Sequence, residues 1–559
     1  MSSIASLKQQ PQTEAERADW WRGAVIYQIY PRSFADSNGD GIGDLNGITR
    51  HLDHVADLGA DAIWVSPFFT SPMRDFGYDI SDFRGVDPIF GSLDDFDALV
   101  ERAHALGLKV MIDQVWSHSS NQHPWFEESR QSRDNARADW YVWHDPKPDG
   151  SPPNNWQSVF GGPAWTWDAR RGQYYLHNFL AEQPDLNLHN PDVQAAILEV
   201  ARFWFARGVD GFRIDALNYT MHDLQLRNNP PMPEDGKPRT RPYDFQLKQY
   251  NQGHEGIALF LERVRGVADE FGATFTLAEV GGDFADTQMK EFTADDKRLN
   301  SAYGFDFLYA DKLTPQTVCK ALAGWPGGDG EGWPSWAFEN HDAPRAVSRW
   351  ADPQHREAFL RMKAMLLLSL RGNSILFQGE ELGLTQVDIP FDKLQDPEAI
   401  ANWPLTLSRD GVRTPIPWQA THNGLGFSTG EPWLPTGPDH AALASTGEPW
   451  LPTGPDHAAL AVDRQAGDPE SILNWTKRMI ALRKANPALR EGTLHDCRAD
   501  GSVLLFERRQ DGQHLLCVFN LAAETAAFAL PEGARIIAET GAHEPNLAPY
   551  AALIAQLES

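Results

Sequence analysis

The sequence predicts an α/β protein built on a (β/α)8 TIM barrel, with an inserted domain, here termed domain B, and a C-terminal antiparallel β-sandwich domain. Short apolar segments alternate with amphipathic segments along most of the 559 residues. A stretch rich in Trp, Pro, Asn and Gly interrupts this alternation, and short apolar runs between turn residues replace it near the C-terminus. Alternating β and α units favour a parallel sheet, and eight of them favour closure into a barrel.

The barrel strands are predicted from the short apolar runs, and the helices from the amphipathic runs between them. Two of these helices end at Gly59 and Gly107, and glycine is the residue that most often ends a helix. We expect strands at residues 24–30, 61–66, 109–115, 210–216, 274–280, 303–309, 335–340 and 373–379. We expect helices at residues 46–59, 93–107, 193–208, 256–271 and 471–483.

The same pattern divides the chain into a tail and three domains. We expect a polar tail at residues 1–18, the barrel at 19–116 and 191–486, domain B at 117–190, and the C-terminal β domain at 487–559.

A tandem duplication lies within the last part of the predicted barrel. The segment STGEPWLPTGPDHAALA occurs at residues 428–444 and again at 445–461. Because a loop absorbs added length at a small entropic cost, a duplication is tolerated there and not inside a strand or helix. We expect one copy to pack as a wall beside the cleft and the other to bulge outward as a mobile loop.

Composition excludes several classes of protein. Lys and Arg total 49 and Asp and Glu total 77, so the formal net charge is −28. Such a surface repels polyanions, which excludes nucleic acids and anionic membranes as partners and favours a neutral or cationic substrate. The N-terminus lacks the apolar core of a signal peptide, and the longest apolar stretch, near residues 364–370, is too short to span a bilayer. We expect a cytoplasmic protein, and monomer and homodimer both remain open.

The cysteines predict neither a disulfide framework nor a metal site. The chain has only Cys319, Cys497 and Cys517, and none has a partner at CxxC spacing. We expect a reducing compartment and no chemical role for these residues.

Three acidic residues stand at the ends of predicted strands, where catalytic groups of a TIM barrel lie. They are Asp215, Glu279 and Asp342. Residues two apart on a strand share a face, so Arg213 points into the same space as Asp215, where its guanidinium favours an ionised carboxylate. A salt bridge or a helix cap explains a single acid of this kind. Three acids on separate strands, with His341 beside Asp342, indicate a catalytic site.

Several collinear motifs resemble those of the α-amylase superfamily of glycoside hydrolases, glycoside hydrolase family 13, and within it the α-glucosidase and oligo-1,6-glucosidase subgroup. The motifs are DQVWSH (113–118), GVDGFRIDA (208–216), TLAEV (276–280), FENHD (338–342), FGYDISDF (76–83) and QPDLN (183–187). The resemblance implies Asp215 as the nucleophile, Glu279 as the general acid/base and Asp342 as the carboxylate that holds sugar hydroxyls in the transition state. It also implies a glucose-binding pocket lined by Asp75, Tyr78, His118, Arg213, His341 and Arg413, and of the aromatic residues in domain B we expect Phe160 to touch sugar.

The resemblance implies a retaining exo-α-glucosidase that acts on small neutral α-glucosides such as maltose through a covalent glucosyl-enzyme, with transglucosylation as a side reaction. Ala216, directly after the nucleophile, favours α-1,4 over α-1,6 bonds, because Val at this position accompanies α-1,6 cleavage in the family. A glucosyltransferase, a sucrose isomerase and an oligo-1,6-glucosidase remain alternatives, since a sugar hydroxyl can replace water as acceptor. The non-catalytic transporter subunits that share the barrel carry a membrane helix and lack the three acids. We therefore do not expect this chain to be such a subunit.

Two further positions bear on the site. Ser117 stands where most family members have Asn before the histidine, and its shorter side chain predicts altered support of His118. In the segment 36–44, Asp36, Asn38, Asp40 and Asp44 with the Ile42 carbonyl place oxygen ligands at alternate positions around a Gly-rich turn. That donor set suits a hard divalent ion, and the family resemblance implies structural Ca2+, or Mg2+, in this loop. A solvated acidic turn is the alternative.

Overall fold

The computed structural model describes residues 19–234, 236, 239–272, 274–325, 332–405, 408–430, 433–434, 458–543 and 545–558. The described strands close an eight-stranded parallel barrel in the order β1-β13-β12-β11-β10-β9-β5-β2. These strands are β1 (Val25–Ile29), β2 (Ala62–Val65), β5 (Lys109–Val115), β9 (Gly211–Asp215), β10 (Phe275–Glu279), β11 (Ser301–Tyr303), β12 (Trp333–Ala337) and β13 (Asn373–Phe377).

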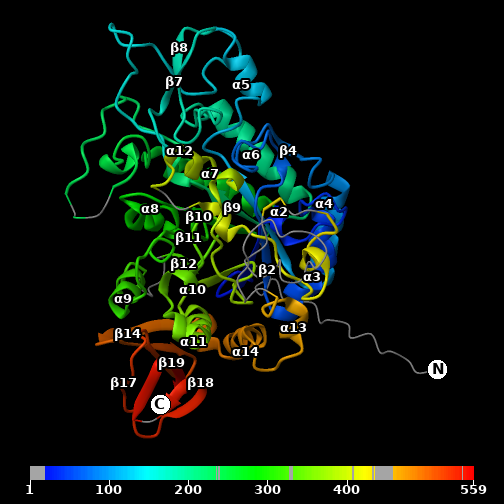
Figure 1. Cartoon of the computed structure of the whole chain (residues 1–559). Coiled ribbons are helices and arrows are strands. Elements are labelled where there is room, and N and C mark those ends of the chain that lie inside the picture. The colour runs from blue at the N-terminus through cyan, green and yellow to red at the C-terminus, as the bar shows by residue number, and fades with distance from the viewer. Residues whose placement is uncertain are drawn as a thin grey trace.

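Helices follow the strands and cover the outside of the barrel (Figure 1). The longer ones are α3 (Leu45–Leu58), α4 (Leu93–Ala105), α6 (Pro191–Ala206), α7 (Gly256–Glu270), α8 (Ala285–Phe292), α9 (Pro315–Ala323), α11 (Arg356–Ser369) and α14 (Ile472–Ala485). Short helices are α2 (Pro31–Phe34), α5 (Pro124–Ser129), α10 (Ala346–Trp350), α12 (Pro397–Asn402), α13 (Val462–Ala466) and α15 (Pro487–Arg490).

Local sequence explains where several of these helices begin and end. The Asp44 carboxylate accepts a hydrogen bond from the Gly47 backbone N–H and caps α3. Gly59 then ends α3 in the left-handed conformation, with a φ of 92°, which glycine adopts without strain. Ser92 and Asp95 form a capping box at the start of α4.

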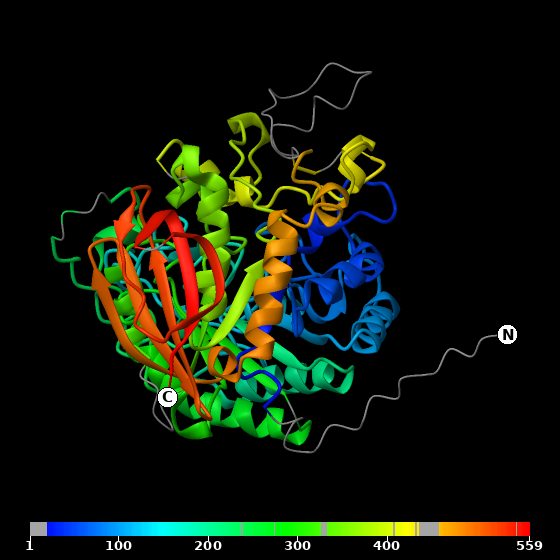
Figure 2. The same cartoon turned by 90° about the horizontal axis from the view of Figure 1, so that it is seen from below.

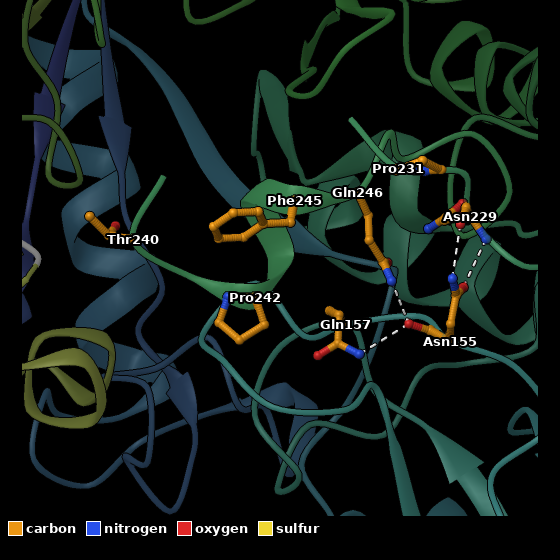
Figure 3. Close-up of a pocket in the computed structure, with 8 residues that line it drawn as sticks. All are labelled: Asn155, Gln157, Asn229, Pro231, Thr240, Pro242, Phe245 and Gln246. Atoms are coloured by element: carbon orange, nitrogen blue, oxygen red, sulfur yellow. Dashed lines mark hydrogen bonds between the residues drawn. The ribbon is translucent and has the colours of Figure 1, made fainter. Parts of the chain in front are cut away.

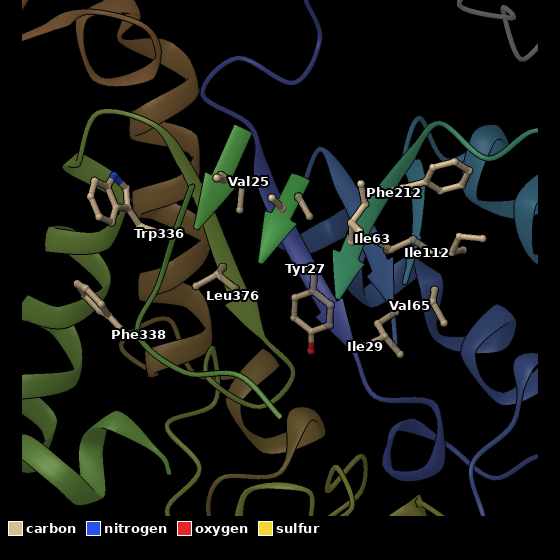
Figure 4. Close-up of a cluster of buried hydrophobic side chains, with 14 of the residues drawn as sticks. Val25, Tyr27, Ile29, Ile63, Val65, Ile112, Phe212, Trp336, Phe338 and Leu376 are labelled. Atoms are coloured by element: carbon tan, nitrogen blue, oxygen red, sulfur yellow. The ribbon is translucent and has the colours of Figure 1, made fainter. Parts of the chain in front are cut away.

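The hydrophobic core lies on both sides of the barrel wall, because successive residues of a strand point to opposite faces. In β1, Val25, Tyr27 and Ile29 join the large cluster between strands and helices (Figure 4). Ile26 from the same strand belongs instead to a second cluster, which includes Trp64. Both faces of each strand are therefore buried, which explains why the strands read as continuous apolar runs.

The predicted barrel is confirmed, but the predicted sixth strand was placed too far along the chain. We expected residues 303–309, whereas β11 ends at Tyr303 and residues 305–309 form turns. Phe307 and Leu308 are nevertheless buried, so their apolarity reflects core packing and not strand pairing. An apolar run of this length does not by itself separate the two cases.

The segment between β5 and α6 contains a three-stranded sheet in the order β6-β8-β7. Its strands are β6 (Trp143–His144), β7 (Trp165–Asp168) and β8 (Gln173–Leu176), and a separate hairpin pairs β3 (Phe69–Thr70) with β4 (Asp82–Val86). Figure 1 shows β7 and β8 at the end of the barrel opposite the C-terminal sheet. Trp156 and Trp165 are buried in the hydrophobic cluster of this segment, whereas Trp167 is exposed.

The C-terminal region forms an antiparallel sheet, as predicted. Its described strands are β14 (Thr493–Asp500), β15 (Val503–Gln510), β16 (Gln513–Asn520), β17 (Ala526–Ala527), β18 (Arg535–His543) and β19 (Asn546–Gln556). They pair in the order β14-β15-β16-β19-β17, with β18 on β19. The sheet lies against α11 of the barrel (Figure 2), and its strand β14 also contacts α9.

The sequence was expected to form no disulfide framework, and the structure has one disulfide that the cysteine spacing did not indicate. Cys319 of α9 and Cys497 of β14 form a disulfide, with their Cα atoms 5.7 Å apart, and Cys517 is free and buried. The two partners lie 178 residues apart, and spacing in the sequence carries no information about a contact made by docking two domains. Across the described part of the chain, no helix combines the length and apolarity needed to cross a bilayer.

Most of the tandem duplication, residues 435–457, lies outside the described residues. At the start of the first copy, Trp433 packs near Phe76, and its backbone N–H donates to the Gly41 carbonyl. Ser428 donates to the Asp36 carboxylate. The first copy therefore begins against the loop that follows α2, while the predicted bulge of the other copy stays a prediction.

Candidate functional site

Parallel register brings the first two predicted acids side by side. Ile214 of β9 faces Ala278 of β10, so Asp215 and Glu279 leave the ends of neighbouring strands together. Ala216 then takes a left-handed conformation with a φ of 41°, and its backbone N–H donates to Glu279 Oε2 at 3.2 Å. A non-glycine residue in this region is strained, and such strain concentrates at functional sites.

Arg213 is the centre of the acidic cluster. Its guanidinium lies 2.6 Å from Asp215 Oδ1, 2.5 Å from Glu279 Oε1 and 2.5 Å from Asp113 Oδ1. Arg213 and Asp113 are fully buried, and the side chains of Asp215 and Glu279 expose only 11% and 8% of their surface. We expected Arg213 to favour an ionised Asp215, and in the structure it contacts Glu279 as well. Arg213 alone therefore does not assign the two roles.

The cluster has one cation against three carboxylates among the described residues. Burial raises the pKa of Asp215 well above its usual value, Arg213 opposes the rise, and the charges of Glu279 and Asp113 add to it. Burial also raises the pKa of Asp113 to about 6, against the effect of Arg213. Such an excess of buried negative charge favours retention of a proton within the cluster.

Asp342 lies in a different electrostatic environment. Although burial opposes its ionisation, His341, Arg409 and Arg413 hold the pKa of Asp342 well below its usual value. Arg413 Nη2 donates to Asp342 Oδ1 at 2.8 Å, and Arg409 Nη1 donates to the same oxygen at 3.2 Å. Asp342 is therefore an anion held in place by two guanidinium groups.

His341 is a neutral side chain that lies between Asp342, Tyr78 and Gln28. Burial lowers the pKa of His341 to about 3. Gln28 Nε2 can only donate, so the His341 Nδ1 at 2.8 Å accepts, and the ring proton is on Nε2. That nitrogen lies 3.2 Å from Asp342 Oδ2 and 2.6 Å from the Tyr78 hydroxyl. The ring of Tyr78 stacks on His341 with an interplanar angle of 3°, which leaves Tyr78 as one wall of the site.

Asp75 and Arg409 close the far end of the site. Arg409 Nη2 lies 3.1 Å from Asp75 Oδ1 and 2.8 Å from Asp396 Oδ1, and its guanidinium carbon lies 5.1 Å from the centre of the Phe160 ring. Burial raises the pKa of Asp75 to about 6, against the opposing charges of Arg409 and Arg413. Phe160 therefore lies beside the site, and Arg409, which the sequence analysis did not single out, is the arginine that contacts Asp75.

The substitution of Ser117 for Asn does not leave His118 without support. Ser117 Oγ lies 2.9 Å from His118 Nδ1, and His118 Nε2 donates to the Tyr78 carbonyl at 3.1 Å. Burial lowers the pKa of His118 to about 4, so its ring is neutral. Gln183 donates to the second oxygen of Asp75 at 3.1 Å.

The structure thus brings the predicted catalytic and sugar-binding residues into one buried cluster at the carboxyl ends of the strands. Three residues that we did not single out join them: Asp113, Arg409 and Gln183. Asp113 and Gln183 lie within motifs that carried the family resemblance. Their presence in those motifs was the only indication in the sequence that they belong to the site. Arg409 precedes Arg413 by four residues, and nothing in that spacing shows which arginine reaches Asp75.

The predicted metal residues form a loop that follows α2. The Asp36 carboxylate accepts backbone hydrogen bonds from Asn38, Gly39 and Gly41 at 2.9, 2.7 and 2.8 Å. Within the ranges that the structure describes, no group of three or more His, Cys, Asp or Glu side chains is gathered closely enough to hold a metal ion. The oxygen donors fit a divalent cation chemically, but in this structure the carboxylates bond to the loop itself.

A groove of about 690 Å³ lies outside the cluster, between the segment with Asn155 and the segments 229–231 and 240–246 (Figure 3). It contains none of the predicted site residues. Asn155 and Asn229 exchange two hydrogen bonds of 2.9 and 2.8 Å, and Gln157 and Gln246 both donate to the Asn155 carbonyl. The amides that line the groove therefore fasten two loops together.

These strand-end acids on a (β/α)8 barrel define the class of protein, and comparison with known sequences agrees. The pattern of the α-amylase catalytic domain matches residues 28–445. The chain belongs to the α-amylase family of glycoside hydrolases.

Its relatives within the family are α-glucosidases and related enzymes. The chain is 50% identical over 553 residues to a probable α-glucosidase of Rhizobium meliloti (strain 1021), covering 96% of this chain and 97% of that protein. It is 34% identical to an oligo-1,6-glucosidase of Parageobacillus thermoglucosidasius, covering 92% of each. Among solved structures, an α-glucosyl transfer enzyme, XgtA, superimposes with a TM-score of 0.90 at 49% identity, covering 96% of this chain and 99% of that one. The trehalulose synthase MutB from Pseudomonas mesoacidophila MX-45 superimposes with a TM-score of 0.84 at 34% identity, covering 96% and 99%.

Proposed function

We propose that the protein is a retaining, exo-acting α-glucosidase that hydrolyses terminal non-reducing α-glucosidic bonds of short oligosaccharides, with α-1,4 bonds preferred. The arrangement of Arg213, Asp215 and Glu279 carries the proposal. Two carboxylates at the ends of neighbouring strands, one to attack and one to transfer a proton, are what a retaining glycosidase needs.

The hydrogen bonds around the two acids support different roles for them. Glu279 Oε1 accepts from the Tyr303 hydroxyl at 3.0 Å, and its Oε2 accepts from the Ala216 backbone. Asp215 uses Oδ1 to meet Arg213, and among the described residues its Oδ2 accepts no hydrogen bond. A carboxylate oxygen without a hydrogen-bond partner suits a nucleophile that must reach the anomeric carbon. Proton transfer to the leaving oxygen is then assigned to Glu279, the acid on the neighbouring strand.

The closed end of the site supports exo action. Asp75, Arg409 and Asp342 are bridged at 3.1 and 3.2 Å, so a sugar chain cannot continue past them without breaking these ion pairs. A single terminal glucose fits this arrangement, and its hydroxyls would meet charged groups at that end. The proposal includes maltose-like neutral substrates, in accord with the acidic composition, and a cytoplasmic location.

Two variants and one product analysis test this function. Asp215→Asn should abolish nearly all turnover, whereas Glu279→Gln should still form the glucosyl-enzyme from substrates with a good leaving group, such as aryl α-glucosides. NMR of the first product should show α-glucose. If β-glucose appears first, the enzyme inverts and Asp215 is not the nucleophile.

Transfer of the glucosyl group to a sugar is the second candidate function, favoured by the likeness to XgtA and MutB. The same glucosyl-enzyme would be intercepted by a hydroxyl in place of water. Chromatography of products from maltose, isomaltose and sucrose decides between them: glucose alone supports hydrolysis, and new oligosaccharides or sucrose isomers support transfer.

We further propose that the loop 36–44 binds Ca2+, or Mg2+, in a structural role. Asp36, Asn38, Asp40, Asp44 and the Ile42 carbonyl supply only oxygen donors, which hard cations prefer. Although partial burial opposes it, hydrogen bonds from Ser428 and backbone N–H groups lower the pKa of Asp36, so its charge is available. Chelation and Asp40→Ala should each lower the thermal midpoint more than the rate. An unchanged midpoint in excess EDTA, with no metal by elemental analysis, would contradict the proposal.

A further inference from the structure

Behind the sugar-binding residues lies a buried arginine that touches three segments of the site at once. Arg345 is fully buried and stands three residues after Asp342. Its Nη1 donates to the Gln378 carbonyl at 2.9 Å, and its Nη2 donates to the Val412 carbonyl at 3.1 Å. Its Nη1 also lies 3.1 Å from Glu339 Oε2.

Each of these partners is next to a residue of the site. Glu339 precedes His341 by two residues at the end of β12. Val412 is adjacent to Arg413, which donates to the His341 carbonyl at 2.7 Å and to Asp342. Gln378 accepts from the Tyr30 backbone N–H, and its own N–H donates to the carbonyl of Gln28, the residue that bonds His341. Arg345 therefore links the ends of β12 and β13 to the turn that carries the two arginines.

A second buried cation, Lys363, also contacts the Glu339 carboxylate that Arg345 contacts. Lys363 of α11 lies 2.8 Å from Glu339 Oε1 and 2.9 Å from Glu380 Oε1. Lys363 and Glu339 each expose 1% of their surface. Although burial opposes ionisation, Lys363 and Arg345 lower the pKa of Glu339, so this carboxylate is charged. Both of its oxygens are therefore used, one by each cation, and its orientation is determined.

We propose that Arg345 is a positioning residue for the glycosidase reaction, which sets the placement of Asp342 and Arg413 relative to each other through its bonds to Glu339, Gln378 and Val412. The inference rests on the proposed function, because it concerns contacts made to the sugar. Arg345 does not touch the substrate. A misplacement of about 1 Å in such groups costs about 100-fold in rate, since the transition state depends on their geometry.

The test is a double-mutant cycle between Arg345→Met and Asp342→Asn, with an aryl α-glucoside as substrate. Methionine keeps much of the volume and removes all three bonds. Arg345→Met should lower kcat by about 10- to 100-fold with little change in KM. In the Asp342→Asn background, the same change should cost less than about three-fold, because the Asp342 charge, whose placement relative to Arg413 is what Arg345 sets, is already lost.

Arg508 provides a matched control. It is also fully buried and donates to two backbone carbonyls, those of Ser369 and Gly492, at 2.6 and 2.9 Å. It lies on β15, away from the site. Arg508→Met should lower the thermal midpoint as Arg345→Met does, but leave kcat per folded molecule within two-fold. Equal losses of kcat in both variants would show a general effect of buried arginines and overturn the proposal.

Two milder variants keep the proposal testable if Arg345→Met does not fold. Arg345→Lys keeps the charge beside Glu339 but cannot reach two carbonyls, so kcat should fall by an intermediate factor. Glu339→Gln keeps the carbonyl bonds and should cost less than Arg345→Lys. The reverse order, or additive losses in the cycle, would overturn the proposal. Wild-type turnover of the same glucoside tests the proposed function separately, so the two failures are distinguishable.

Discussion

Arg409 is the residue whose removal has the most specific expected consequence. Arg409→Met breaks ion pairs of 3.1 Å to Asp75, 3.2 Å to Asp342 and 2.8 Å to Asp396. Asp342 keeps Arg413 at 2.8 Å, and Asp396 keeps the Arg409 backbone N–H at 2.9 Å. Asp75 instead loses the cation that contacts it directly and is left buried.

The expected magnitude follows from that unpaired carboxylate. Removing one partner of a buried ion pair costs about 3–5 kcal/mol of stability. A charge-assisted hydrogen bond to a sugar hydroxyl is worth about 1.5–3 kcal/mol, so kcat/KM should fall about 10- to 150-fold. The pKa of Asp75, about 6 in the intact site, should rise further, because the largest opposing charge is gone. The acid limb of the kcat/KM profile should therefore move to higher pH.

The dependence of stability on pH has a definite sign. The folded-state pKa of Asp75 is raised from the ordinary 3.8 to about 6, so folding disfavours its ionised form. Its contribution to stability is most favourable below the ordinary pKa and falls as the pH rises through about 6. In Arg409→Met, the pH range over which stability falls should extend to higher pH. Adding Asp75→Asn removes the charge, and the double variant should be more stable than Arg409→Met at pH 8.

The assay is a series of thermal midpoints and kcat/KM values from pH 4 to 9 for the wild type, the two single variants and the double variant. Arg409→Lys is the control that keeps the charge. The reasoning is refuted if Arg409→Met shows the wild-type acid limb, or if Asp75→Asn further destabilises it at pH 8.

Three further predictions concern other parts of the chain. Ala216, one or two methyl groups smaller than the Val of α-1,6 enzymes, should give maltose a kcat/KM advantage worth about 1–3 kcal/mol over isomaltose, and a clear preference for isomaltose would contradict this. The Cys319–Cys497 disulfide closes a long loop of 178 residues, so its loss should cost at most about 5 kcal/mol; a reductant should lower the thermal midpoint of the wild type but not that of Cys319→Ser. Deletion of residues 445–461 should leave kcat on maltose within a few-fold and raise stability slightly, whereas an inactive or insoluble product would show that both copies are built into the fold.

Most of the barrel could be predicted because its signals are local. Gly59 after an amphipathic run ends a helix, and buried parallel strands show as short apolar runs, whatever the rest of the chain does. The sixth strand was misplaced for the same reason: Phe307 and Leu308 are as apolar as a strand but are buried in turns. An apolar run indicates that residues are buried, whereas a strand also requires backbone hydrogen bonds to a neighbouring strand.

The location of the site residues could be predicted where each residue lies in a recognisable motif. Asp215, Glu279 and Asp342 follow predicted strands, so their common location follows from the rule that strand ends meet at one end of the barrel. The protonation states and charge partners of these acids could not be predicted in the same way. Arg213 was expected to favour ionisation of Asp215 alone, but it also contacts Glu279 and Asp113.

By itself, the sequence determined which chemistry the chain can carry: the barrel, the strand-end acids and the residue types around them. Only the tertiary structure decided which partner each charged group has. Arg409 reaches Asp75 across 334 residues, Arg345 reaches Val412 across 67, and Cys319 meets Cys497 across 178. The physical reason is that secondary structure depends on neighbours along the chain, whereas a buried charge or thiol is paired by whatever the packing of distant segments places within reach.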